Sequence, residues 1–352
     1  MERCKKLKKL LFLLSGVVLI FSACKKDRAV LKDHFILRNQ GADMPVWVEG
    51  NAASKALLLV VHGGPGGDGQ VYNTLMKGFS DKMEAELAMV YWDQRGSGNS
   101  AGHFNADLYN VELFADDLSK LITVLKKRYP DKKIFLMGHS WGGTLITAFA
   151  RNAERQKTID GFIEVDGAHN FLGIPEIVMA FKIVGNNQIA VNNNAAEWRE
   201  IVSYCNTVDV NNPTDSEIAQ LNNYGFQAEI YLKDAGEIVY ESGEEKPGYF
   251  LLRGSYNFAT AQANLRTTNS TLFNELKRTN FTNDFKDITL PSLFMWGKYD
   301  LVVPIELGKQ AFAKSGAADK TFVEFEKSGH SPMSNEMEYF STTVISWVKA
   351  RW

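Results

Sequence analysis

The segment that most constrains how this chain can fold is Gly138-His139-Ser140-Trp141-Gly142, which has the pattern Gly-x-Ser-x-Gly. The apolar run before it, residues 133–137, is short enough for a buried strand, and residues 143–150 are predicted to form a helix. A tight strand-to-helix turn lifts the serine hydroxyl above the edge of a sheet. It also directs the first N–H groups of the helix at the group that the serine attacks. The segment therefore predicts a nucleophilic serine, Ser140, and acyl transfer as the reaction class.

Apolar runs elsewhere in the chain predict the rest of a sheet. Residues 35–48 are expected to form an antiparallel hairpin. Continuous apolar runs predict buried strands at 56–61, 87–92, 161–166, 292–296 and 321–325. The spacing of apolar residues predicts helices at 111–129 and 335–350. Strands alternating with helices predict the α/β fold class, with a mostly parallel sheet flanked by helices.

This alternation stops in the middle of the chain. Residues 171–289 show no clear succession of strands and helices, and most of this stretch has a helical pattern. We expect it to be an insertion over a sheet that the chain later rejoins. The predicted organisation is a first core part at 34–170, the insertion at 171–289 and a second core part at 290–352.

The N-terminus has the pattern of a secretory signal. Five basic residues lie within the first nine, an apolar run follows at 10–21, and Ser22 and Ala23 precede Cys24. Small residues directly before a cysteine resemble the lipobox of bacterial lipoproteins. That resemblance implies a signal peptide at 1–23, a lipid on Cys24, a polar tether at 24–33 and attachment to a membrane of the bacterial cell envelope. A plain secretory signal is the alternative.

Composition narrows the classes of partner. The 352 residues carry a formal net charge of −2 and show no basic patch with interleaved aromatic side chains, so we expect no nucleic-acid partner. Outside the leader and Cys24, Cys205 is the remaining cysteine, and it is expected to be a small buried hydrophobe. Because no Cys-x-x-Cys pair occurs and histidines number six, we expect neither a metal site nor a cofactor. The oligomeric state stays open.

A glycine-rich loop follows the strand that ends at Val61. This loop, residues 62–67, leaves backbone N–H groups close to a ligand, and together with the amide after the nucleophile it could form an oxyanion hole. We expect the N–H groups of Gly64 and Trp141 to supply it, with His62 shaping the loop. A phosphate-binding loop is disfavoured because the Gly-Lys-Ser/Thr ending is missing.

Asp300 and His330 each follow a predicted strand near the C-terminus. A serine hydroxyl needs a base to take its proton, and histidine titrates near neutrality. A carboxylate behind the imidazole orients it and stabilises its charged form. The order Ser140, Asp300, His330 is the order of the α/β-hydrolase type. Asp166 also ends a strand and is the alternative acid.

Charged residues elsewhere are given structural roles. Arg95 could pair with Asp93 and brace the loops within residues 93–98, which most simply form a turn. Asp116 and Asp117 are expected on the solvated face of a helix. The side chain of His139 is expected to point away from that of Ser140, because neighbours on a tight turn diverge.

Three motifs together resemble the proline iminopeptidase group of α/β-hydrolase serine peptidases. They are His-Gly-Gly-Pro-Gly at 62–66, Asp-Gln-Arg-Gly-Ser-Gly at 93–98 and Gly-His-Ser-Trp-Gly-Gly at 138–143. The resemblance implies removal of an N-terminal residue, often proline, from small peptides. It also implies a helical cap between the sixth and seventh strands, where the 171–289 insertion falls. His139 stands where that family often has glycine.

In that family, cap glutamates hold the free amino group of the substrate. The candidates in this chain are Glu197, Glu200 and Glu229. Two other functions stay open: an esterase or lactonase on the same scaffold, and a lipoprotein that binds ligands without catalysis.

Overall fold

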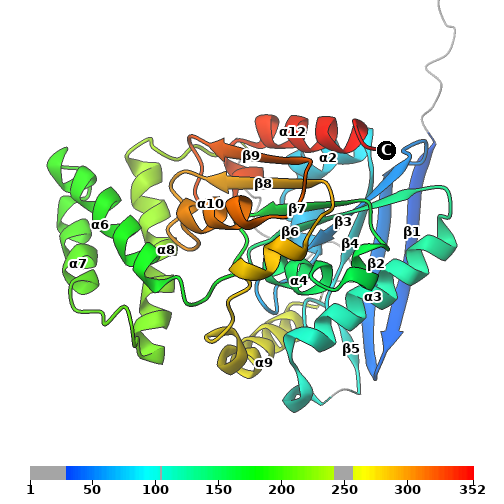
Figure 1. Cartoon of the computed structure of the whole chain (residues 1–352), viewed down its shortest axis with the longest axis horizontal. Coiled ribbons are helices and arrows are strands. Elements are labelled where there is room, and N and C mark those ends of the chain that lie inside the picture. The colour runs from blue at the N-terminus through cyan, green and yellow to red at the C-terminus, as the bar shows by residue number, and fades with distance from the viewer. Residues whose placement is uncertain (1–28, 104, 242–256) are drawn as a thin grey trace, which may run out of the picture.

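The computed structural model describes residues 29–103, 105–241 and 257–352 (Figure 1). The predicted signal peptide and Cys24 lie outside these residues. The predicted tether, residues 24–33, overlaps with the first described residues, and its predicted C-terminal end is wrong. The first strand begins at Val30, so residues 30–33 belong to the sheet.

In the described part of the chain, nine strands form one sheet in the order β1-β2-β4-β3-β6-β7-β8-β9, and the short β5 pairs with β2. β1 and β2 are antiparallel to their neighbours, and β3, β4, β6, β7, β8 and β9 pair in parallel. The expected hairpin and the mostly parallel sheet are therefore confirmed. The strands are β1 Val30–Asn39, β2 Ala42–Asn51, β3 Ala56–Val61, β4 Ala88–Trp92, β5 Ala101–Gly102, β6 Lys133–His139, β7 Gly161–Val165, β8 Ser292–Gly297 and β9 Lys320–Phe325.

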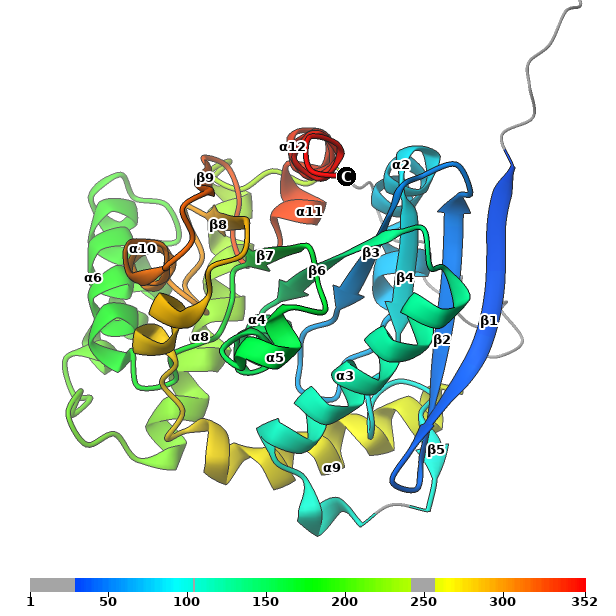
Figure 2. The same cartoon turned by 45° about the vertical axis from the view of Figure 1, so that its right-hand side comes forward.

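Helices cover both faces of this sheet, as Figure 2 shows. Because successive side chains of a strand point to opposite faces, β3 divides its apolar residues between two cores. Leu57 and Leu59 pack with α3 and α4, whereas Leu58 and Val60 pack with α2 and α12. Full burial of one such side chain stabilises the fold by roughly 1.5–3 kcal/mol. The helices are α2 Lys77–Glu86, α3 Val111–Arg128, α4 Trp141–Ala150, α5 Ala153–Gln156, α10 Ile305–Lys314, α11 Pro332–Asn335 and α12 Met337–Lys349.

The insertion between β7 and β8 is helical. When the two-residue β5 is left out, these are the sixth and seventh strands, where the cap was expected. Three of the helices that the structure describes in it share a core of their own, in which Cys205 is buried as predicted. The fourth, α9, lies along the opposite side of the site, below α3 and α4 in Figure 2. The helices are α6 Ile174–Ala190, α7 Ala195–Cys205, α8 Asp215–Asp234 and α9 Phe258–Leu276.

The last part of the insertion packs with the main core rather than with the cap. The 3₁₀ turn η4, Thr282–Asp287, contributes Phe285 to the core beside α4 and α10, and α9 contributes Leu272. The side chain of Thr268 in α9 also donates a hydrogen bond to the carbonyl of Gly96, in the loop after β4. The end of the insertion therefore packs as part of the main core.

The sheet also fixes where a ligand can bind. From β3 the chain first moves outward to β4 and then returns to β6 on the other side of β3. Ligands bind beside such a switch point, at the carboxyl ends of the parallel strands. The loop after β3 and the turn after β6 meet there, and the cap helices α6, α7 and α8 lie to the left of the sheet in Figure 1.

Candidate active site

Ser140 occupies the sharp turn between β6 and α4. Its backbone has φ 56° and ψ −120°, a conformation that side-chain-bearing residues rarely adopt. The two flanking glycines permit it. A Cβ on Gly142 would collide with the carbonyl oxygen of Val61, and one on Gly138 would collide with the backbone of Gly142. This strained turn presents the Ser140 side chain at the N-terminus of α4, as a nucleophilic serine requires.

Asp300 and His330 are brought together from the loops after β8 and β9. Nδ1 of His330 lies 2.8 Å from Oδ2 of Asp300. The other carboxylate oxygen of Asp300 accepts hydrogen bonds from the N–H groups of Val302 and Val303, each at 2.8 Å. These donors hold the carboxylate in place.

The net environment of His330 favours its protonated form. Burial alone would lower the pKa of His330, but the Asp300 carboxylate and, more weakly, Glu229 outweigh it and raise that pKa. The imidazole is therefore a stronger base than a free histidine, with Nδ1 committed to Asp300 and Nε2 left to act on a substrate or nucleophile.

His139 ties the His330 loop to the nucleophile turn. Its Nε2 donates to the carbonyl oxygen of His330 at 2.6 Å, and its Nδ1 accepts from the hydroxyl of Tyr72 at 2.6 Å. The two imidazole rings are 5.0 Å apart, centroid to centroid. Burial, followed by the nearby His330, lowers the pKa of His139 to about 3, so this ring is neutral. Since His139 directly precedes Ser140, these contacts connect the His330 loop to the turn that carries the serine.

The loop after β3 also reaches Ser140. Gly64 lines the same pocket as Ser140, and a Cβ on Gly63 would lie 3.3 Å from the Ser140 Cβ. His62 shapes this loop as expected. Its Nδ1 donates to the carbonyl of Gly63 at 2.8 Å, and its Nε2 accepts from the N–H of Gln94 at 3.2 Å. Burial lowers its pKa to about 4, so it too is neutral.

Trp141 is buried directly after the serine. Its indole Nε1 donates to the side chain of Gln94 at 2.9 Å. As the first residue of α4 it has a backbone N–H without an acceptor inside the helix. Gln94 in turn donates to the carbonyl of His62 at 3.1 Å. The sequence motif at 93–98 thus connects the two segments that were expected to supply the oxyanion hole.

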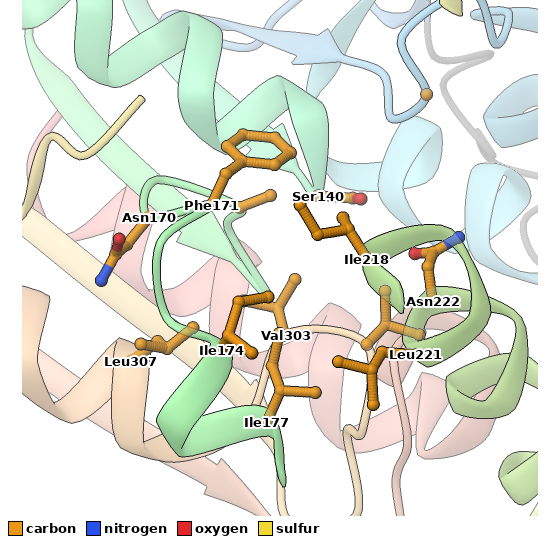
Figure 3. A pocket seen from close by; sticks show the side chains of 13 residues that line it. Ser140, Asn170, Phe171, Ile174, Ile177, Ile218, Leu221, Asn222, Val303 and Leu307 are labelled. Carbon is orange, nitrogen blue, oxygen red and sulfur yellow. The ribbon is translucent and has the colours of Figure 1, made fainter. Parts of the chain in front are cut away.

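A pocket opens beside Ser140 (Figure 3). It encloses about 680 Å³ of empty space, part of which is open solvent. Apart from Ser140 and two asparagines its walls are apolar or glycine, and no lining residue among those described is charged. The walls come from the loops after β3, β7 and β8, from α10 and from the cap helices α6 and α8: Gly64, Ala168, Asn170, Phe171, Ile174, Ile177, Ile218, Leu221, Asn222, Val302, Val303 and Leu307.

The three candidate cap glutamates have different surroundings. None of the three is among the residues that line the pocket, and Glu197 and Glu200 are exposed on α7. Glu229 in α8 is buried, and its Oε1 accepts the backbone N–H of His330. Burial raises the pKa of Glu229, although that N–H works against the change. The sequence carried no motif that singles out Glu229.

Two structural expectations are wrong. Arg95 pairs with Asp117 of α3, not with Asp93, through bonds of 2.6 and 2.9 Å. Asp117 is therefore fully buried, whereas only Asp116 lies on the solvated face. Asp93 instead accepts the backbone N–H groups of Gly69 and Asn99. The motif at 93–98 stabilises the loops, but through partners that the sequence had not indicated.

The described residues provide neither a metal site nor a membrane span. They contain no group of three or more histidine, cysteine or acidic side chains that could hold a metal ion. None of their helices combines the length and hydropathy that a membrane span requires.

The fold and the serine turn define the class. The family model described as "alpha/beta hydrolase fold" matches residues 56–336, and the chain belongs to this family. Over 344 residues it is 26% identical to the "Probable aminopeptidase YbaC" of Bacillus subtilis, covering 91% of this chain and 96% of that one. It is 23% identical to the proline iminopeptidase of Heyndrickxia coagulans, covering 82% and 88%. A solved serine hydrolase of carbazole degradation superposes with a TM-score of 0.60 at 14% identity, covering 91% and 100%.

Proposed function

We propose that this protein is a serine hydrolase that releases the N-terminal residue, proline or a similar apolar one, from small peptides. The observation that carries the hydrolytic part is the His330–Asp300 hydrogen bond at 2.8 Å, held beside the Ser140 turn by His139. The peptidase part is supported by two curated relatives, a probable aminopeptidase and a proline iminopeptidase, which match 91% and 82% of this chain.

In the proposed mechanism, Nε2 of His330 takes the proton of the Ser140 hydroxyl as its oxygen attacks the carbonyl carbon of the first peptide bond. Asp300 stabilises the resulting imidazolium. The N–H groups of Gly64 and Trp141 stabilise the negative charge on the carbonyl oxygen. His330 then gives its proton to the leaving amine as the C–N bond breaks, and water hydrolyses the acyl-enzyme by the same two proton transfers.

The lining of the pocket favours a peptide substrate whose first residue has an uncharged side chain. Its apolar wall, formed by Ile174, Ile177 and Leu221, suits an aliphatic side chain or a proline ring, and a charged one would lose its hydration there. The positive amino group of the substrate needs a negative partner. Of the three cap glutamates, Glu229 is the one beside His330, so we assign the amine-binding role to Glu229 rather than to Glu197 or Glu200.

A panel of aminoacyl-naphthylamides with free and acetylated amino groups tests this proposal. We expect proline and other apolar residues to be cleaved and acetylated forms to be cleaved much more slowly. Glu229→Gln should raise KM for free-amine substrates, whereas the matched control Glu197→Gln, on the exposed face of α7, should not. Equal rates for free and acetylated forms would overturn the aminopeptidase assignment.

An esterase or lactonase is the second candidate. The absence of charge among the described pocket-lining residues favours it, because an ester of an uncharged acid needs no carboxylate partner. Hydrolysis of p-nitrophenyl acetate with a kcat/KM far above that of any naphthylamide, unaffected by Glu229→Gln, would establish it in place of the peptidase. A ligand-binding protein without catalysis would leave Ser140 unlabelled by a fluorophosphonate probe.

For the cellular location, we propose that Cys24 carries a lipid and that the enzyme acts at the bacterial cell envelope. The support is the sequence of the leader, with small residues directly before Cys24. Metabolic labelling with an alkyne fatty acid should mark the wild-type chain in the membrane fraction and spare Cys24→Ser. A wild-type chain released without label would contradict the anchor and leave a plain secretory signal.

A further inference from the structure

Asp166, at the end of β7, is a buried carboxyl group that the proposed mechanism does not use. It is fully buried, and its Oδ1 accepts the backbone N–H of Gly297 at 2.9 Å. Among the described residues no N–H or hydroxyl group donates to its other oxygen. The carbonyl oxygen of the same Gly297 accepts the backbone N–H of Asp300 at 3.3 Å, and the carboxyl groups of Asp166 and Asp300 contact each other. Two carboxyl groups in such contact cannot both be ionised without strong repulsion, so one of them keeps a proton.

The number of hydrogen-bond donors around Asp166 and Asp300 shows which of the two carboxyl groups keeps the proton. Asp300 accepts from the N–H groups of Val302 and Val303 and from the imidazole of His330, which makes three donors. A shared proton is better placed on the carboxyl group that has fewer donors. Asp166 accepts from one, the N–H of Gly297. Burial is the main reason that the pKa of Asp166 is well above that of an ordinary aspartate, and the negative charge of Asp300 adds to it. Both arguments assign the proton to Asp166.

We propose that Asp166 is a positioning residue that stays protonated at neutral pH and donates a hydrogen bond to the Asp300 carboxylate, holding it against His330. This role rests on the proposed catalytic function of Asp300 and His330. It replaces the alternative in which Asp166 is itself the acid behind the histidine, because the imidazole bonds to Asp300.

A neutral Asp166 has a chemical consequence for the base. Glu229 from the cap and Asp300 already raise the pKa of His330, and Tyr72 on the core side is a neutral phenol. A further negative charge at Asp166 would keep the imidazole protonated at neutral pH and unable to accept the serine proton. A protonated carboxyl group orients Asp300 and adds no charge.

The Asp166→Asn variant distinguishes a protonated Asp166 from an ionised one. Its side-chain oxygen can accept from Gly297, its NH₂ can donate to Asp300, and it tolerates the left-handed φ of 44° found at Asp166. We expect Asp166→Asn to keep kcat within about threefold of wild type and to leave the acidic limb of the pH–kcat/KM profile where it is. Asp166→Ala should lower kcat about tenfold or more, the effect of losing one charge-assisted hydrogen bond. An acidic limb that moves to lower pH in Asp166→Asn would mean that a negative charge had been removed, and would overturn the proposal.

A spectroscopic test is independent of activity and of whether Asp166→Ala folds. The infrared difference spectrum of wild type minus Asp166→Asn at pH 7 should contain the C=O stretch of a protonated carboxylic acid. The matched control is Asp319→Asn, since the ion pair with Arg351 lowers the pKa of Asp319 and its carboxyl group is ionised. Absence of the acid band from the Asp166 difference spectrum would refute a protonated Asp166. Presence of the band in an inactive enzyme would instead count against the proposed function alone.

Discussion

The Nε2 of His139 donates a hydrogen bond to the carbonyl oxygen of His330, 2.6 Å away. The contact joins the residue before the nucleophile to the proposed base, from segments almost 200 positions apart in the sequence. On the other side, the N–H of His330 donates to Glu229 of the cap. The backbone of His330 is therefore fixed from both the core and the cap, which restricts where its imidazole can point.

We predict that His139→Ala lowers kcat by about tenfold, because one hydrogen bond to the His330 backbone is lost and the ring becomes less well placed. KM should change little, since His139 is not among the residues that line the pocket. Steady-state kinetics of the variant would check this. Tyr72→Phe is the control: it removes the partner of Nδ1 and leaves the His330 contact in place, so its kcat should fall less. Equal losses of kcat in the two variants would show that the placement of His330 does not depend on its hydrogen bond with His139.

Ser140→Ala should fold normally and lose activity by a factor on the order of 10⁴ or more, as removal of a serine nucleophile does in such triads. The fold should survive because the side chain is small and its turn is held by backbone contacts, among them the Ser140 N–H to the Val165 carbonyl at 3.0 Å. Circular dichroism and thermal unfolding would confirm the fold, and single-turnover assays the loss. Turnover retained in a preparation shown free of wild-type enzyme would exclude Ser140 as the nucleophile.

Activity should rise with pH along an acidic limb that reports His330. The neutral imidazole is the active form, and its pKa is raised, so half-maximal kcat/KM should fall above the ordinary histidine value of about 6.5. His62 and His139 do not titrate within this pH range, because their pKa values are about 4 and about 3. Asp300→Asn removes the charge that raises the pKa of His330, so the limb should move to lower pH while the rate falls by several orders of magnitude. A profile that is flat from about pH 5 to 8 would contradict a histidine base.

Much of this site could be predicted from the sequence because each of its parts directly follows an apolar run. Ser140, Asp300 and His330 come after β6, β8 and β9, and the carboxyl ends of parallel strands meet at one edge of a sheet. The pairing of Asp300 with His330 then follows from topology. For the same reason the glycine loop after β3 could be expected at Ser140.

The residues that were missed depend on contacts between distant segments. Nothing in the motif at 93–98 indicates that Arg95 reaches α3, and Glu229 lies in a cap helix without a recognisable pattern. For Asp117, by contrast, the spacing of the neighbouring apolar residues does indicate that the side chain is buried. It is three residues after Phe114 and four before Leu121, both buried, so helical spacing places it on the buried face of α3. At this position helical periodicity is a better guide to burial than charge.

The Arg95–Asp117 pair gives a prediction about stability. The two side chains are 2% and 0% exposed, and Arg95 also donates to the carbonyl of Asn39 in the β1–β2 turn. Arg95→Ala leaves a carboxylate buried without its cation, which should destabilise the fold by about 3–5 kcal/mol. Replacing both partners, Arg95→Met with Asp117→Leu, removes both charges and should recover most of that loss.

The matched control for this pair is Arg38→Ala. Arg38 pairs with Asp43 at a similar distance, 3.0 Å, but is 77% exposed, so its loss should cost at most about 1 kcal/mol. Urea unfolding of the variants would separate the two cases, with an unchanged slope showing that stability rather than compactness had altered. If Arg95→Ala were as mild as Arg38→Ala, water would have to reach Asp117, and the motif at 93–98 would not stabilise the loops through this pair.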